Sequence, residues 1–428
     1  GNEEISIGMF VGTSVTPNSR QDAIYELNQL EENHDPKNFV FVVLKCPCCG
    51  KQLGLVDGNS ELRGLEESDN TVKFKCYGAC PYSNQYMPIY VIDDDVYENR
   101  PSLVIGTVDK FALIPFQVEM RHLFGVDTPV RGQRSPPSLI IQDELHLISG
   151  PLGSMVGHYE GIFHKLMEQE DNLPKIIAST ATISMAREQI NTLYAADPKD
   201  IMIFPPPGID HDDSFFAKMD RTPGTGRKYV GLFANSSPSF STSQVRIYSI
   251  LLQSAKLFDD ISDKVRDAYH TLLCYFSSLK ELGHARTILT DDVATGRLQQ
   301  LHKKLEITAD QKRYLNTNKI IELTSRIPNY DIPNVMRLLD GTIIDDKAID
   351  ACLATNMISV GLDVQRLGIM CCVTQPKSTA EYIQATSRIG RDKSRPGVVF
   401  TIYNTARARD MSHFERFISY HSKIYTHV

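Results

Sequence analysis

Short apolar segments, separated by polar or glycine-containing turns, recur along the chain. They are rich in Val, Ile and Leu at consecutive positions rather than at alternating ones. This pattern is typical of strands buried on both faces of a parallel sheet. The predicted strands lie at residues 5–11, 39–44, 103–105, 139–141, 176–178, 272–276, 369–373 and 398–402.

Helical patterns lie between several of these strands, for example at 184–194 and 246–259. Alternating strands and helices predict an α/β layer architecture. A chain of 428 residues is too long for one ordinary core, so we expect more than one domain. Proline, glycine and serine clusters interrupt the pattern between 203 and 243. We therefore predict a first domain at 1–203, a connecting segment at 204–262 and a second domain at 263–428.

Composition and charge narrow the class of protein. Apolar residues make up 42% and charged residues 23%, which is the profile of a globular protein. The net charge of −7 excludes a nucleic-acid-binding protein that depends on an overall excess of basic residues. A protein that binds phosphates in a local basic channel can still have this net charge. We find no apolar run of about 18 residues and no signal-peptide pattern. We therefore expect a cytoplasmic protein without membrane association.

Five of the nine cysteines cluster between Cys46 and Cys80. Cys46 and Cys49 form one close pair, and Cys76 and Cys80 form a second. Two such pairs on separate turns have the spacing of a zinc ribbon or knuckle, in which four thiolates bind one ion. We predict a structural Zn²⁺ site in an insertion at about 45–86, with free surface thiols as the alternative. Cys48 is expected to point away from the ion, unless the register is shifted by one.

The other four cysteines lie in apolar runs, and we expect them to be buried. They are Cys274, Cys352, Cys371 and Cys372.

An acidic pair, Asp143 and Glu144, follows the predicted strand at 139–141. The carboxyl ends of parallel strands are where open α/β sheets bind ligands. There the first carboxylate can hold Mg²⁺ through water, and the second can orient and deprotonate an attacking water. In isolation the pair is weak evidence for this chemistry, and a helix N-cap is the alternative.

Two further segments fit the same chemistry. Residues 179–182, Ser-Thr-Ala-Thr, end another predicted strand, and their hydroxyls can bond the acidic pair. Arg388 and Arg391 are three positions apart, so on a predicted helix they point in one direction. Their guanidinium groups can neutralise charge on a transferring phosphoryl group. A solvated basic face is the alternative for the two arginines.

In order, the motifs Asp-Glu-x-His, Ser-Thr-Ala-Thr, Ala-Thr…Gly-x-Asp and Gln-x-x-x-Arg-x-Gly-Arg resemble motifs II, III, V and VI of superfamily 2 helicases. Residues 5–19, 106–112, 322–328 and 359–391 resemble more closely the helicase subunit of DISARM-type anti-phage defence systems, which has a cysteine-containing insertion in a similar place. The resemblance implies two RecA-like lobes and an ATP-dependent helicase or translocase acting on DNA. It also implies a second protein subunit in a defence complex.

The resemblance also implies roles for single residues. Asp143 would coordinate Mg²⁺, Glu144 would be the catalytic base, and His146 would sense the γ-phosphate or link the lobes. The remaining nucleotide-site residues would be Thr180 and Thr182 for coupling, Gly361 and Asp363 in the ATP cleft, Arg391 as arginine finger, and Arg388 and Gln384 beside the phosphates.

Nucleic-acid contacts are implied for Thr355 and for the turn at 106–110, with Thr107 and Lys110. A solvated lysine on a helix is the alternative for Lys110. Phosphate contacts of this kind carry no base specificity.

The sequence departs from the superfamily in one respect, because it contains no Gly-Lys-Ser or Gly-Lys-Thr phosphate loop. Such a loop cradles the β- and γ-phosphates. In the superfamily it precedes motif II, so we expect it upstream in the natural protein and expect this chain alone not to hydrolyse ATP. The alternatives are a non-catalytic nucleic-acid-binding scaffold with a helicase fold and, less favoured, a zinc-dependent binding module.

Overall fold

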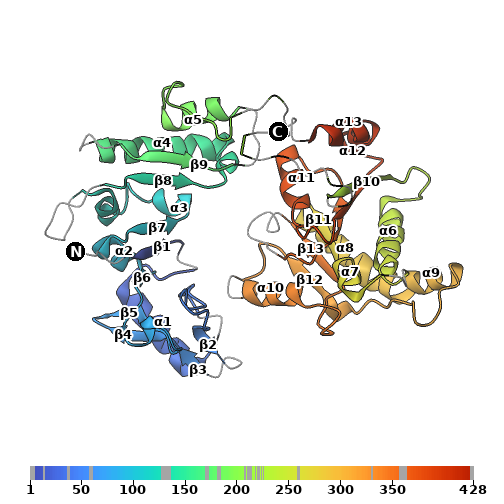
Figure 1. Ribbon diagram of the computed structural model, residues 1–428, viewed down its shortest axis with the longest axis horizontal. Coiled ribbons are helices and arrows are strands. Elements are labelled where there is room, and N and C mark those ends of the chain that lie inside the picture. Colours follow the sequence, from blue (N-terminus) through green and yellow to red (C-terminus); the bar gives the residue numbers. More distant parts are fainter. Residues whose placement is uncertain are drawn as a thin grey trace. The chain divides into compact units, whose positions relative to one another are not determined.

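The computed structural model divides the chain into two compact units (Figure 1). The first contains Gly1–Thr180 and Met185–Met202, and the second contains Ala181–Ser184 and Ile203–Val428. The structure describes residues 5–12, 15–35, 39–56, 61–126, 136–168, 173–180, 185–206, 226–257, 261–328, 331–355 and 364–424, with single positions between 209 and 224. Both units are α/β with parallel sheets, which confirms the predicted fold class. Among the described residues, no helix has the length and apolar character needed to cross a membrane.

Outside the cysteine-rich insertion, the described residues of the first unit form two sheets of short parallel strands. Strand β1 (Ile7–Phe10) lies between β6 (Ile89–Tyr90) and β7 (Leu103–Gly106), and β8 (Leu139–Gln142) pairs with β9 (Lys175–Ala178). Besides α1, described below, the helices of this unit include α2 (Asp93–Asn99), α3 (Val108–Phe111), α4 (Gly150–Met167) and α5 (Ala186–Tyr194).

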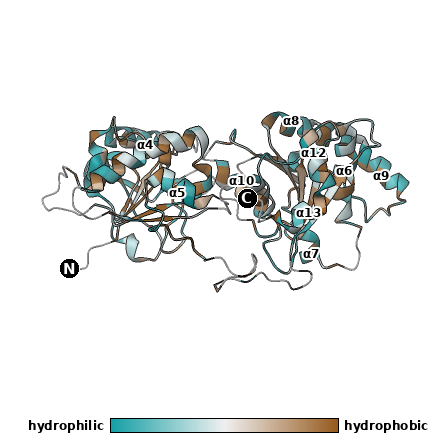
Figure 2. Ribbon diagram, turned by 90° about the horizontal axis from the view of Figure 1, so that it is seen from above, coloured by the Kyte–Doolittle hydropathy of each residue, from teal (hydrophilic) through white to brown (hydrophobic). Residues whose placement is uncertain are grey.

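The prediction that these strands are buried on both faces is wrong for the first unit. Ile105, Ile141 and Ile177 are 47%, 63% and 45% exposed. In Figure 2 the strands are coloured as hydrophobic and have α4 and α5 along one side. Parallel sheets normally have both faces covered, so this unit presents apolar sheet surface to solvent.

The cysteine-rich insertion is a small folded body that packs on α1 (Arg20–Asn33). It contains two antiparallel pairs, β2 (Gly54–Val56) with β3 (Glu61–Arg63) and β4 (Leu65–Ser68) with β5 (Thr71–Phe74). Leu27 and Leu30 of α1 pack against Phe74 and Cys76 in one core. The strand predicted at 39–44 is wrong. These residues form no strand, and Phe41 is fully buried in this core.

A six-stranded parallel sheet in the order β10-β15-β14-β11-β13-β12 organises the second unit. Its strands are β10 (Lys228–Phe233), β11 (Leu272–Phe276), β12 (Ile320–Leu323), β13 (Ala351–Ala354), β14 (Ile369–Val373) and β15 (Val398–Tyr403). Its helices are α6 (Phe240–Ser254), α7 (Asp263–Ala268), α8 (Leu279–Thr287), α9 (Leu298–Lys304), α10 (Ile332–Asp340), α11 (Thr379–Thr386), α12 (Ala408–Glu415) and α13 (Phe417–Ser422), with Ile288–Arg297 wound as a π-helix. Strand β10 and helix α6 lie within 204–262, so that segment contributes to this unit.

Both faces of this sheet are covered (Figure 1). Successive side chains of a strand point to opposite faces. On β11, Leu273 and Tyr275 therefore pack with α10 and α11, whereas Leu272, Cys274 and Phe276 pack with α6 and α8. The continuous apolar runs of β11 and β14 follow from this double burial.

Candidate nucleotide, nucleic-acid and metal sites

The ends of β8 and β9 bring motifs II and III together in the first unit. Gln142 and Ala178 are in register, so Asp143 and Ser179 follow them at the same edge. The Ser179 N–H donates to Gln142 O at 2.8 Å, and the Ser179 hydroxyl donates to the Asp143 carboxylate. The predicted coupling hydroxyls are Thr180 and Thr182, but Ser179 makes the direct bond to the acidic pair. Thr182 lies outside the described residues.

The catalytic base predicted from the motif is held in an uncommon backbone conformation. Glu144 has φ +51°, in the left-handed region that few non-glycine residues occupy. Its N–H donates to Asp143 Oδ1 at 2.9 Å, and its carboxylate lies 3.3 Å from His146 Nδ1. Thr180 Oγ1 is 3.5 Å from the same ring nitrogen. The structure thus groups two carboxylates, an imidazole and hydroxyls at one sheet edge, which can bind a hydrated divalent cation and accept a proton.

Gln189 of α5 supports this edge and was missed by sequence reasoning. Its amide donates to Leu145 O at 3.0 Å and to Ile148 O at 2.7 Å. These bonds fix the turn that directly follows Glu144. Nothing in a lone glutamine on a helix indicates such a role.

The prediction that Arg388 and Arg391 lie on a helix is wrong. Helix α11 ends at Thr386, and both arginines belong to the following turn. Gly390 has φ +61°, and a Cβ there would lie 2.3 Å from Gly397 N. The positive φ is not helical, and the close approach leaves no room for a side chain, so this position requires glycine.

Arg227 holds this turn from the start of β10. Its Nε donates to Ile389 O at 2.8 Å, and its Nη2 donates to Ser387 O at 3.1 Å. Arg391 is exposed beside it, and Gln384 is half-buried on α11. Sequence reasoning did not predict this role of Arg227, since its partners lie about 160 residues away in the chain.

Thr355 ends β13 at the carboxyl edge of the second sheet, and its N–H donates to Leu323 O at 3.3 Å. Two further polar residues at this edge were not predicted. Ser277 follows β11, and its buried Oγ has no hydrogen-bond partner among the described residues. Arg326 follows β12 and is exposed. Gly361 and Asp363 lie outside the residues that the structure describes.

The two residues of the 106–110 turn that were predicted to contact nucleic acid lie in different environments. Thr107 is exposed between β7 and α3. Lys110 is only 4% exposed, with its ammonium 2.5 Å from Asp93 Oδ2 and 2.8 Å from Asn18 Oδ1. Because the Lys110 ammonium is directed inward, it is an internal ion-pair partner in this structure and not a solvated lysine.

The four predicted metal-binding cysteines converge. The ligand atoms of Cys46, Cys49, Cys76 and Cys80 all lie within 4.8 Å of one another. The Cys49–Cys76 and Cys46–Cys80 sulfur distances are 3.5 and 3.9 Å, close to the edge of about 3.8 Å expected for a tetrahedron with Zn–S bonds of about 2.3 Å. This donor set fits a structural zinc ion. Cys48 is exposed and lies outside the group.

The backbone favours thiolate at the first of these cysteines. Burial opposes ionisation of Cys46, but the N–H groups of Cys49 and Cys48 outweigh it and lower its pKa to about 7. The Gly78 N–H donates to the Cys76 sulfur at 3.2 Å. Backbone donors directed at sulfur are expected of a site that holds thiolates.

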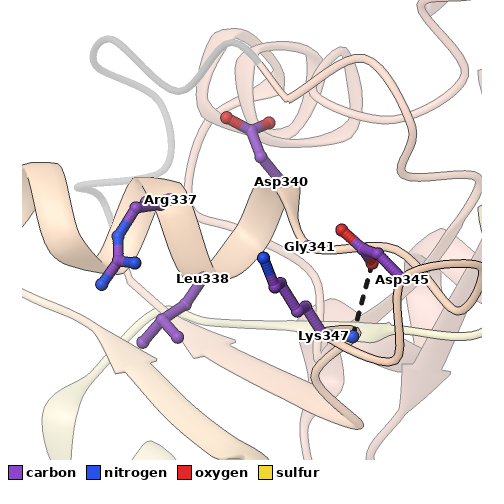
Figure 3. A pocket seen from close by; sticks show the side chains of 6 residues that line it. All are labelled: Arg337, Leu338, Asp340, Gly341, Asp345 and Lys347. Atoms are coloured by element: carbon purple, nitrogen blue, oxygen red, sulfur yellow. Dashed lines mark hydrogen bonds between the residues drawn. The ribbon is translucent and has the colours of Figure 1, made fainter.

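A hollow of about 490 Å³ beside the end of α10 contains none of the predicted site residues. Figure 3 shows its lining residues, in which Arg337 and Lys347 alternate with Asp340 and Asp345. The Lys347 N–H donates to Asp345 Oδ1. Carboxylates among the cations make the hollow unsuited to a phosphate.

Comparison with known proteins agrees with the motifs. The "Helicase conserved C-terminal domain" model matches residues 294–393. The DISARM protein DrmA of Bacillus paralicheniformis is 39% identical over 464 aligned positions, which cover 99% of this chain and 40% of that protein. The crystal structure of DUF1998 helicase MrfA bound to DNA has a TM-score of 0.51 at 16% identity, over 97% of this chain and 45% of that one. This chain therefore spans less than half the length of either relative.

Proposed function

We propose that this chain, a DrmA-like member of the superfamily 2 helicases, forms most of the motor of an ATP-dependent helicase or translocase. The substrate we propose is DNA, and the setting is anti-phage defence together with a second protein subunit. The relative's own name and the DNA-bound neighbour support this setting. Since the chain covers 40% of that relative, the activity is proposed for the full-length protein.

The observation that carries the proposal is the arrangement of Asp143, Glu144 and His146 beside Ser179. Asp143 would position Mg²⁺, which neutralises phosphate charge when it is bound. Glu144 would accept the proton of the attacking water, with His146 and Thr180 beside it. Arg388 and Arg391, on the turn held by Arg227, would neutralise charge on the phosphates.

Nucleic acid would contact polar groups at strand ends. In the second unit these are Thr355, which is buried in this structure, half-buried Ser277 and exposed Arg326, and in the first unit exposed Thr107. The Cys46, Cys49, Cys76 and Cys80 cluster would hold one Zn²⁺ as a structural ion, since four thiolates leave no open coordination position.

The test is ATP turnover, with and without single-stranded DNA, by this chain and by the full-length protein. We expect DNA-stimulated turnover in the full-length protein only, because the 428 residues contain no Gly-Lys-Ser/Thr loop. Glu144→Gln in the full-length protein should lower turnover by about 10²–10⁴-fold and leave nucleotide binding intact. The matched control, Glu188→Gln, changes an exposed glutamate of the same unit.

A full-length Glu144→Gln protein that still hydrolyses ATP would show that Glu144 is not the base. If full-length protein with native Glu144 binds DNA but never turns over ATP, the alternative applies: a non-catalytic nucleic-acid-binding scaffold. The missing phosphate loop is the observation that favours this second candidate.

A further inference from the structure

Three consecutive aspartates begin helix α2, and together their carboxylates bind three other segments of the first unit. Asp93 binds Lys110 of α3. Asp94 accepts from the Arg20 N–H at 3.0 Å, at the start of α1. Asp95 accepts from the Thr71 hydroxyl, in β5 of the cysteine-rich insertion. Helix α2 therefore joins segments that are far apart in sequence.

The Asp93–Lys110 pair fixes the turn that carries Thr107. Asp93 is 5% exposed and Lys110 4%, and the two charged groups are 2.5 Å apart. The Lys110 N–H donates to Thr107 O at 3.0 Å, so the lysine closes the same turn through its backbone. Breaking a buried ion pair leaves an uncompensated charge, which strongly destabilises its surroundings. The position of Thr107 thus depends on Asp93.

At its other contact, α2 is bound to the insertion. Thr71 is 6% exposed, and its Oγ1 lies 2.5 Å from Asp95 Oδ2. The other oxygen of Asp95 accepts from Arg20 Nε at 2.7 Å. Strand β5, which begins at Thr71, ends just before Cys76 of the sulfur cluster. The chain of β5 therefore leads from the buried Thr71–Asp95 contact on α2 to the sulfur cluster.

We propose that α2 is the connection through which the cysteine-rich insertion holds the Thr107 turn in place. Asp95 is the link to the insertion, and Asp93 is a positioning residue for the turn. This inference rests on the proposed function, in which the cluster holds Zn²⁺ and the turn contacts nucleic acid. Loss of the ion would loosen β5, then α2, and finally the turn.

Hydrogen exchange of the amides at 106–112 tests the connection directly in the full chain. Thr71→Val keeps the side-chain shape and removes the hydroxyl, and Asp93→Asn removes the charge. Each should accelerate exchange at 106–112 by about tenfold. Because both act through α2, the double variant should exchange no faster there than Asp93→Asn alone. Removal of Zn²⁺ with a chelator should reproduce the Thr71→Val effect.

Two controls separate this connection from general destabilisation. Tyr86→Phe also removes one hydroxyl from the insertion, but its partner is Glu66 and not α2, so exchange at 106–112 should not change. Amides of α4 should be unaffected in every variant. If Asp93→Asn fails to fold, adding Lys110→Met removes the stranded charge, and the comparison is made in that background.

Additive effects of Thr71→Val and Asp93→Asn, or faster exchange confined to 61–90 after zinc removal, would overturn the connection. Binding of a single-stranded oligonucleotide is measured in parallel, and Thr71→Val should weaken it about fivefold. If the unaltered chain and the full-length protein bind no DNA, the nucleic-acid role of the turn fails. The exchange data would still decide whether α2 links the insertion to the turn.

Discussion

The arginines of the second unit lie in the segment that follows α11, which ends at Thr386. Gly390, between them, has a positive φ and lies so close to Gly397 that no side chain fits there. The spacing of the two arginines indicated their chemistry but not this geometry. Only the position of residue 397 in space makes a side chain at residue 390 impossible.

Arg227 should be needed for turnover although it precedes the first strand of its unit. Arg227→Met removes two charge-assisted bonds to the carbonyls of Ser387 and Ile389, and the turn carrying the arginines loosens. Because small displacements of catalytic groups are costly, we expect kcat of the full-length protein to fall about tenfold or more. Lys228→Met, at the next, exposed position, is the matched control. Unchanged kcat in Arg227→Met would remove Arg227 from this role.

Glu160 on α4 should make the chain less stable as pH rises. Burial raises its pKa from 4.5 to about 7. The folded state therefore binds the proton more tightly than the unfolded state, and stability falls as pH rises from about 4.5 through 7. Glu160→Gln removes this loss, so its melting temperature should exceed that of the unaltered chain by about 3 °C at pH 8 and by less at pH 5.

Glu168→Gln, near the end of the same helix, is the control for Glu160. A hydrogen bond from Lys165 lowers the pKa of Glu168, so its substitution should bring no gain at pH 8. Equal gains at pH 5 and pH 8 in Glu160→Gln would contradict the assigned titration.

Among the elements, the insertion should depend on its metal. Cys76→Ser removes a buried ligand of the four-sulfur group, whereas Cys48→Ser changes an exposed cysteine outside it. Zinc content by mass spectrometry should be one ion per chain in Cys48→Ser and should be lost in Cys76→Ser. Zinc retained in Cys76→Ser would remove Cys76 from the ligand set, and zinc lost in Cys48→Ser would shift the first pair by one residue.

Apolar runs predicted β11 and β14, which are buried on both faces. The equally buried strand β13 was missed, because its run of four residues, with two alanines, is short. Other strands gave a weaker signal. Strand β12 is an edge strand and carries Glu322, which pairs with Arg286 at 2.8 Å. The run at 39–44 failed for the opposite reason, since its apolar side chains fill the core of the insertion without forming a ladder. Hydrophobicity reports burial, and a strand also requires a neighbour.

For the candidate site, the sequence predicted the residues better than their connections. Asp143, Glu144, His146 and Thr180 come together as the motifs predict. Lys110 does not follow its motif, because its partner Asp93 belongs to another helix. The roles of Gln189 and Arg227 depend on backbone carbonyls, which no side-chain pattern reveals.

At the scale of the whole molecule, the two units differ in how fully the faces of their sheets are covered. Residues 203–428 contain a six-stranded sheet covered on both faces, so this segment expressed alone should be soluble and unfold in one cooperative transition. Residues 1–202 expose Ile105, Ile141 and Ile177 and should self-associate and bind a hydrophobic dye. The comparison is made by light scattering and calorimetry. A monomeric 1–202 segment together with an aggregating 203–428 segment would reverse this assignment.

Four buried cysteines in the sheet of the second unit allow its opening to be measured chemically. Cys274, Cys352, Cys371 and Cys372 are fully buried on three adjacent strands, and burial raises the pKa of Cys352, Cys371 and Cys372. A thiol in that state is shielded from alkylating reagents and is protonated, so it reacts only after the sheet opens. The rate at which these four thiols are alkylated therefore measures the rate at which this unit opens. Alkylation of exposed Cys48 gives the reference rate of a thiol that needs no opening.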